Sequence, residues 1–347
     1  MLGSDRTWQP FNFDEKTDRL DRASVVPQIG QGSLSTQDYA YDETGNRVEE
    51  IQHALGGGQT VRSYTTPDQG PAHAVATVDE QGVGGTSVHS YDYDEAGNMV
   101  RRTTGEHDQT LEWGPEGELV RVTDGLERTE YVYDASGERL LRRANGATTL
   151  YLPGMEVTWD PAAGTEEATR YYTHAGATVA VRQDDRGLHW VFSDQHGTGQ
   201  MTVDAVWGEV AQRRMTVFGQ DRGATGEWPG ERGFVDGTVD ATMGLTQLGA
   251  RAYDAALGRF ISVDPLMGLV DGQQMHGYAY ANNNPVSFTD PDGLILCQSS
   301  RDHDCAPLKN SKGKTVSHVY TGPNGFNSTR YAAGSAYGIG STLIKVG

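Results

Sequence analysis

The chain has 347 residues, 45 of them glycine, and a formal net charge of −19 at pH 7. With 36% hydrophobic residues, this glycine content favours many short strands joined by tight turns over a few long helices. The negative charge argues against nucleic acid or an anionic membrane as a partner of the body of the chain, because a polyanion is repelled. We therefore predict an all-β body.

The N-terminus does not have the pattern of a secretory signal, since Met1 to Asp5 contain neither a basic region nor an apolar run. No stretch approaches the ~20 apolar residues of a membrane span. We predict no membrane span and no signal peptide in this chain. Secretion would then depend on a dedicated delivery machine or on a part of the protein outside this sequence.

A short motif recurs in the first 150 residues, with alternating aromatic residues, an Asp-x-x-Gly turn and a second alternating run. The copies are residues 39–48, 91–100 and 131–140. A degenerate copy begins near Trp113 and keeps a spacing of 20 residues between successive turn glycines. Alternation followed by a tight turn is typical of a β-hairpin. We predict that the hairpins stack side by side into one long sheet whose strand edges are paired.

The acidic turns suggest a calcium site, because Asp92, Asp94 and Gly97 resemble the start of an EF-hand loop. However, Ala96 stands where a third oxygen ligand belongs. We therefore predict that these aspartates bond the backbone of their own turn. We predict no metal site and no cofactor.

A second polar pattern lies in residues 190–199, where His196 follows Asp194. No serine or cysteine nearby stands in a recognisable nucleophile turn, so we interpret His196 as a loop histidine. Tryptophans along this part of the chain are interpreted as packing anchors on strands; they are Trp113, Trp159, Trp190, Trp207 and Trp228.

The composition changes after Leu294. Residues 1–294 hold 22 Lys and Arg against 45 Asp and Glu, whereas residues 295–347 hold six against two. Both cysteines, Cys297 and Cys305, lie in this basic tail, where they either close one small disulfide loop or remain free thiols. An acidic body around a basic tail is electrostatically favourable. Lysines with histidines are compatible with a nuclease, so nucleic acid is a candidate partner of the tail.

Two segments just before the tail carry the most specific pattern. Residues 249–265 read Gly-Ala-Arg-Ala-Tyr-Asp-Ala-Ala-Leu-Gly-Arg-Phe-Ile-Ser-Val-Asp-Pro, and residues 282–294 end in Asp-Pro-Asp-Gly-Leu. Together with the tyrosine-aspartate repeats upstream, they make the chain resemble the core region of RHS-repeat (YD-repeat) proteins. This is a family of polymorphic toxins, used in competition between bacteria and related to the C components of insecticidal Tc toxins. The resemblance covers most of residues 1–294.

The resemblance implies a hollow β-shell that encloses the protein's own C-terminal segment as cargo. Its expected parts are YD-repeat hairpins in 1–150, continued shell in 151–248, a self-cleaving plug in 249–294 and a basic effector in 295–347. The family also implies secretion machinery and an immunity protein as partners.

The resemblance further implies that the plug acts once, in cis, as an aspartic peptidase that cuts after the leucine of Asp-Pro-x-Gly-Leu. The bond carried over to this chain is Leu294–Ile295. The catalytic residues carried over are Arg251, Asp264 and Asp290. The residues that support the motif are Pro291, Asp292 and Gly293.

Elementary chemistry is consistent with these roles. Amide hydrolysis needs a base to activate water and an acid to protonate the leaving nitrogen, and two close carboxylates supply both because their repulsion separates their titrations. Asp264 and Asp290 are the predicted pair, and Arg251 is the orienting or oxyanion-stabilising cation. Asp292 is the alternative to Asp290.

Other interpretations stay open on the residues alone. The Asp-Pro pairs are also ordinary turn dipeptides, and an arginine can simply pair with a nearby acid. The tyrosine-rich repeats would then belong to a non-enzymatic scaffold for adhesion, binding carbohydrate or a cell surface. A further alternative makes residues 295–347 a structural part of the shell.

Overall fold

The computed structural model describes side chains and backbone for most of the chain before the tail. The described ranges are 11–25, 35–54, 57–135, 137–174, 177–223, 226–266, 275–294 and 296–297, together with the backbone of three tail strands at 307–309, 315–321 and 327–331. Strands dominate these ranges, and short 3-10 turns such as η1 (Phe234–Asp236) and η3 (Ala281–Asn283) interrupt them. The all-β prediction is confirmed.

The described residues up to Gln212 form one sheet of 19 strands in which each strand pairs antiparallel with its neighbours in sequence. The strands of its first half are β1 (Phe11–Phe13), β2 (Leu20–Val25), β3 (Ser35–Tyr41), β4 (Arg47–Ala54), β5 (Gln59–Thr65), β6 (Thr77–Gly82), β7 (Gly85–Tyr93), β8 (Met99–Thr104), β9 (His107–Trp113) and β10 (Leu119–Asp124). Those of its second half are β11 (Glu127–Tyr133), β12 (Arg139–Ala144), β13 (Ala147–Leu152), β14 (Met155–Asp160), β15 (Thr165–His174), β16 (Ala177–Gln183), β17 (Gly187–Ser193), β18 (Gly199–Asp204) and β19 (Val210–Gln212).

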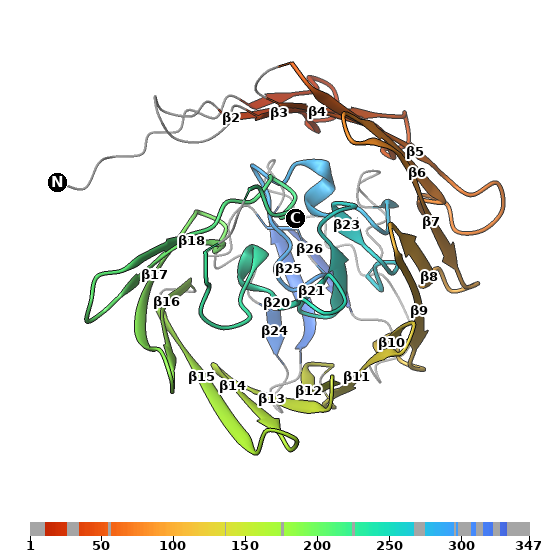
Figure 1. The fold of residues 1–347 in the computed structure, drawn as a ribbon. Coiled ribbons are helices and arrows are strands. Elements are labelled where there is room, and N and C mark those ends of the chain that lie inside the picture. The colour runs from red at the N-terminus through yellow and green to blue at the C-terminus, as the bar shows by residue number, and fades with distance from the viewer. Residues whose placement is uncertain are drawn as a thin grey trace.

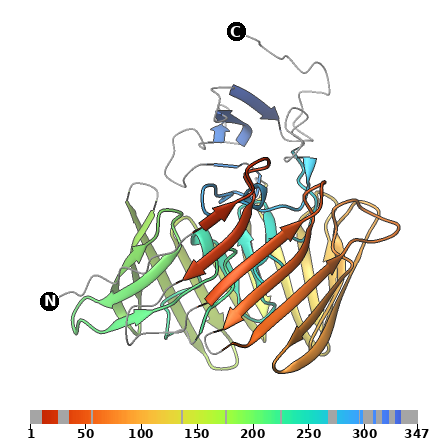
Figure 2. The same cartoon turned by 90° about the horizontal axis from the view of Figure 1, so that it is seen from above.

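This sheet bends into an open ring, as Figure 1 shows along the axis of the ring and Figure 2 shows from the side. The repeat copies predicted from sequence are the hairpins β3–β4, β7–β8 and β11–β12. The predicted shell of stacked hairpins is therefore confirmed.

The aspartates of the repeats close their own turns. Asp94 accepts hydrogen bonds from the Asn98 backbone N–H at 2.8 Å and the Asn98 side chain at 3.1 Å. Its backbone carbonyl accepts from Gly97 N–H at 3.0 Å, and Gly97 has a φ of 86° that favours glycine. Asp94 therefore bonds the residues of its own turn, as the sequence predicted for these aspartates.

The described residues of 213–294, here called the inner segment, lie inside the ring (Figure 1). They contain a second antiparallel sheet made of β20 (Thr238–Asp240), β21 (Leu245–Leu248), β22 (Arg251–Asp254) and β23 (Arg259–Phe260). Its strands are buried almost throughout, which distinguishes them from the strands of the ring.

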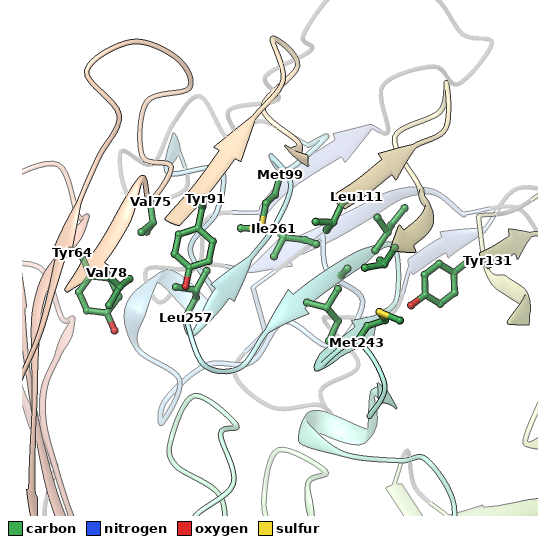
Figure 3. Packing of buried hydrophobic residues seen from close by; sticks show 14 residues of the cluster. Tyr64, Val75, Val78, Tyr91, Met99, Leu111, Tyr131, Met243, Leu257 and Ile261 are labelled. Atoms are coloured by element: carbon green, nitrogen blue, oxygen red, sulfur yellow. The ribbon is translucent and has the colours of Figure 1, made fainter. Parts of the chain in front are cut away.

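Buried side chains join the ring to the inner segment. In Figure 3 the repeat tyrosines Tyr91 and Tyr131 point from the ring toward Leu257 and Met243 of the inner segment. A second cluster joins Leu20 and Tyr39 of the ring to inner aromatic residues; these include Phe218, Phe234, Tyr253, Phe260 and Tyr280. Because burying a large apolar side chain contributes about 1.5–3 kcal/mol, these clusters hold the inner segment firmly against the ring.

The tryptophans only partly follow the prediction. Trp113 packs against the first cluster and donates its indole N–H to the Met99 carbonyl at 2.7 Å. Trp159, Trp190 and Trp207 are exposed, so their interpretation as packing anchors was wrong. They stand on the solvent face of the ring or on its loops, where alternation alone does not tell which face is covered.

The tail contains three antiparallel strands, β24 (Pro307–Lys309), β25 (Thr315–Thr321) and β26 (Asn327–Tyr331). In Figure 2 they lie beyond one end of the ring. Within the described ranges, no helix has the length and apolar character needed to cross a membrane.

Candidate functional site

Arg251 begins β22 and stands at the centre of the predicted site. Its side chain is 3% exposed, and its guanidinium carbon lies 3.6 Å from the centre of the Phe260 ring. Its Nη2 donates to Oδ2 of Asp264 and to Oδ2 of Asp290, both at 3.2 Å. The structure thus brings together the three residues that the sequence indicated as catalytic.

Each aspartate uses its other oxygen to bond local backbone. Oδ1 of Asp290 accepts from Leu294 N–H at 2.9 Å, and Oδ1 of Asp264 accepts from Leu266 N–H at 2.7 Å. Because both Oδ2 atoms contact one nitrogen, they cannot lie farther apart than twice the 3.2 Å contact. The Asp264 side chain is 16% exposed and the Asp290 side chain 6%, so water has better access to Asp264.

Two glycines allow the predicted cleavage motif to approach β21 and β22. Gly249 has a φ of 48° and Gly293 a φ of 65°. A Cβ on Gly249 would overlap the Asp292 backbone, and a Cβ on Gly293 would overlap the Leu248 carbonyl oxygen. The contact is fixed by a hydrogen bond from Ala250 N–H to the Asp292 carbonyl at 3.0 Å. Only a residue without a side chain fits either position.

The backbone around the predicted cleavage bond is held on both sides. Thr289 and Cys297 exchange two backbone hydrogen bonds, at 2.8 and 2.7 Å, and so close the loop that carries the bond. Leu294 packs with Leu266 and Cys297. Ile295 lies outside the described residues.

The arginine also contacts the backbone of this loop, because its Nε donates to the carbonyl of Gly293, which directly precedes Leu294. Asp292 accepts from Leu294 N–H at 3.1 Å. The Arg251 guanidinium donates to Asp290, which favours Asp290 over Asp292 for the predicted role. Pro291 is half-buried at the start of the turn.

Other residues that the sequence singled out also lie near this region. Cys297 is disulfide-bonded, and Cys305 lies outside the described residues. His196 bonds the Val286 carbonyl through Nε2 at 2.8 Å, which ties its loop to the segment leading to Asp290. Burial raises the pKa of Asp194, which accepts from the backbone N–H groups of His196 and Thr198.

Sequence reasoning missed several supporting groups. The Gly277 carbonyl accepts from Arg251 Nη1 at 3.0 Å and from Asp264 N–H at 2.9 Å, so it fixes both residues at once. Nothing in the sequence around Gly277 marks this role. Phe260 and Gly249 do lie within the quoted motif, and a glycine two residues before Arg251 was a signal of close backbone approach.

A comparison with known protein families identifies the family of this chain. A family model described as the teneurin YD-shell matches residues 14–286, which is most of the chain. The chain belongs to the YD-shell family. The sequence-based resemblance to RHS toxins is thereby confirmed, and the ring of β1–β19 is a YD-shell.

Similar proteins include known toxins. The YD-shell chain is 29% identical over 269 residues to the tRNA3(Ser)-specific nuclease WapA of Bacillus spizizenii, covering 74% of this chain and 11% of that protein. It is 28% identical over 311 residues to double-stranded DNA deaminase toxin A of Burkholderia cenocepacia, covering 84% and 19%. The crystal structure of TcdB2-TccC3-Cdc42 matches with a TM-score of 0.59 at 19% identity, over 83% of this chain and 17% of that chain. The chain therefore spans less than a fifth of each.

Proposed function

We propose that this YD-shell is the C-terminal core of an RHS-repeat toxin, and that it cuts itself once after Leu294. The observation that carries the proposal is the contact of one buried guanidinium, Arg251, with both Asp264 and Asp290. Asp290 in turn bonds the N–H of Leu294, the residue that precedes the bond to be cut.

The geometry supports acid–base catalysis. Both carboxylates contact one guanidinium nitrogen and therefore lie close together in a mostly buried site. Two adjacent carboxyl groups can supply the base and the acid that aspartic peptidases require. Asp264, the more exposed of the two, is the proposed base, and Asp290 is the proposed acid.

In the proposed reaction, Asp264 takes a proton from a water molecule whose oxygen attacks the carbonyl carbon of Leu294. Arg251 stabilises the developing oxyanion. Asp290 donates a proton to the nitrogen of residue 295, and the C–N bond breaks to give a carboxyl group on Leu294 and a new amino terminus. Because catalyst and substrate are one chain, effective concentration replaces binding affinity.

We further propose that the tail is a toxic enzyme acting on nucleic acid and that it needs an immunity protein and delivery machinery. Its net positive charge supports a nucleic-acid target, and two similar proteins are a tRNA nuclease and a double-stranded DNA deaminase toxin. We also propose that the tail is cargo enclosed by a longer shell, since the similar proteins are several times longer than this chain.

The test is the intact mass of the purified chain under denaturing conditions. The parent chain should give two fragments divided at Leu294–Ile295, and Asp264→Asn should give one full-length chain. Asp160→Asn is the matched control, because Asp160 also precedes a proline but its side chain bonds the backbone of its own exposed turn. A folded parent that stays uncut, or an Asp264→Asn variant that is cut normally, would contradict the proposal.

The second candidate function is a binding scaffold. Exposed aromatic side chains on the ring favour it, including Tyr172, Trp190 and Phe192. This alternative expects one intact polypeptide that binds carbohydrate or a cell surface through the outer face. Glycan binding by an uncut chain, lost in Trp190→Ala, would support the scaffold over the peptidase.

A further inference from the structure

A cavity of about 600 Å³ lies where the end of the sheet meets the inner segment. Met201 of β18 lines it from the shell, while Met215, Phe234 and Val286 line it from the inner segment. Phe11 reaches it from β1, at the other end of the sheet. In Figure 1 this is the side on which the ring is open, between β2 and β18. The volume is typical of sites for small organic ligands.

The lining is positively charged although the chain is acidic. Among the described residues that line the cavity are three arginines, Arg213, Arg214 and Arg222, and one carboxylate, Asp194. That carboxylate is occupied by its own loop: it accepts from two backbone N–H groups and from Gln200 Nε2 at 3.1 Å. The cavity is therefore suited to an anion rather than a cation.

Arg213 gives the strongest indication of an anionic ligand. It is 6% exposed, stacks 3.7 Å from the centre of the Trp228 ring, and donates to backbone carbonyls at 2.7 and 2.8 Å. Within the described part of the chain it forms no ion pair. Burial lowers the pKa of Arg213 to about 10, although the charges of Asp221, Asp236 and the lining residue Asp194 oppose this shift. A buried guanidinium that stays charged at neutral pH without a paired anion is energetically unfavourable.

His196 adds a second polar group. It is 8% exposed, and its Nε2 bonds the Val286 carbonyl at 2.8 Å. A carbonyl only accepts, so Nε2 carries the hydrogen and Nδ1 of the neutral ring is an acceptor. Nδ1 is buried and has no hydrogen-bond partner among the described residues. A ligand with a hydroxyl or N–H donor would satisfy this nitrogen.

The remaining lining is suited to an organic group. Aromatic and thioether side chains contribute, among them Phe11, Phe234, Tyr280 and Met215. We propose that the cavity binds an organic phosphate that also carries a hydroxyl donor and an aromatic ring, which is the chemistry of a nucleoside monophosphate. The phosphate contacts the arginines, a hydroxyl donates to His196, and the ring packs against the apolar side.

The test is calorimetric titration of the full chain with adenosine monophosphate, adenosine and inorganic phosphate. We expect saturable binding of adenosine monophosphate, with adenosine and phosphate each weaker by at least about tenfold. Equal binding of adenosine would overturn the proposal, because the arginines would then contribute nothing. No heat from the folded chain with adenosine monophosphate would overturn it as well.

Variants test which cation is responsible. Arg213→Gln should abolish binding, but Arg213 also holds two backbone carbonyls, so Arg222→Gln serves as the variant that leaves those bonds in place. We expect Arg222→Gln to weaken the binding of adenosine monophosphate by at least about tenfold. Arg143→Gln, on an exposed position of β12, removes the same charge and should bind like the parent. If Arg222→Gln and Arg143→Gln weaken binding equally, the effect comes from net charge alone and the site is rejected. Asp264→Asn should bind normally, so this result is independent of self-cleavage.

Discussion

The ring and the inner segment use similar strands but bury them differently. Along β9 exposed and buried residues alternate, because one face of the ring meets solvent. In β21 and β22 every residue is buried. The ring therefore has a face that tolerates change, whereas β21 and β22 have none. Polar groups in the inner segment must be paired, and Arg251 is the clearest example because each of its nitrogens donates a hydrogen bond.

The largest expected effect is the loss of the inner arginine. Arg251→Met leaves Asp264 and Asp290 without their common cation, and breaking a buried pair costs about 3–5 kcal/mol of the free energy of unfolding. Urea unfolding measures this cost, and intact mass should show no cleavage. The matched control on the ring is Arg101→Met, whose exposed pair with Asp108 should matter little. Equal destabilisation by both variants would refute the distinction between the two regions.

A carboxylate where ring and inner segment meet should make stability depend on pH. Burial first, and the charge of Glu231 second, raise the pKa of Glu156 from 4.5 to about 7. The folded state therefore holds this proton more tightly than the unfolded state does. The stabilisation is complete below pH 4.5 and is lost as the pH rises through about 7, by roughly 3 kcal/mol in all.

Glu156→Gln should remove this part of the pH dependence, because the amide does not titrate. Urea unfolding of parent and variant across that pH window measures the difference in slope. Glu127→Gln is the control on an exposed position of β11 and should keep the parent's slope. A variant with an unchanged slope would show that Glu156 titrates normally.

A smaller effect is expected at the close approach of the cleavage motif. Gly293→Ala forces an L-residue into a φ of 65° and places its Cβ against the Leu248 carbonyl oxygen. Gly105→Ala meets a similar φ of 61° in open space. We expect Gly105→Ala to lose ~1–2 kcal/mol of stability, and Gly293→Ala to lose more and to be cut more slowly. Time courses of fragment appearance and thermal unfolding distinguish the two variants; equal losses would indicate that the close approach is not tight.

The repeats were predictable because their local pattern is self-sufficient. Alternating tyrosines and an Asp-x-x-Gly turn define a hairpin without reference to the rest of the chain, and the tyrosines Tyr39, Tyr91 and Tyr131 are buried as that pattern requires. The exposed Trp190 was misjudged, because alternation separates two faces without saying which one the inner segment covers. That choice depends on contacts with residues far away in the sequence.

The site was predictable only in part, and mainly through the family resemblance. Arg251 and Asp290 are 39 positions apart, and no spacing rule brings them together. Their meeting depends on the Gly277 carbonyl and on two facing glycines, which belong to three different segments. At the cavity the sequence marked only Asp194 and His196, because the rest of the lining comes from both ends of the sheet and from the inner segment.

The two backbone hydrogen bonds between Thr289 and Cys297 would make release of the tail a separate step from cleavage of the chain. A cut after Leu294 would leave Leu296 within the second buried cluster and Cys297 paired with Thr289. These hydrogen bonds and apolar contacts would then hold the tail without a covalent link at the cut, as a ligand is held by its receptor. Its escape would follow a dissociation rate set by that short docking segment rather than the rate of peptide hydrolysis.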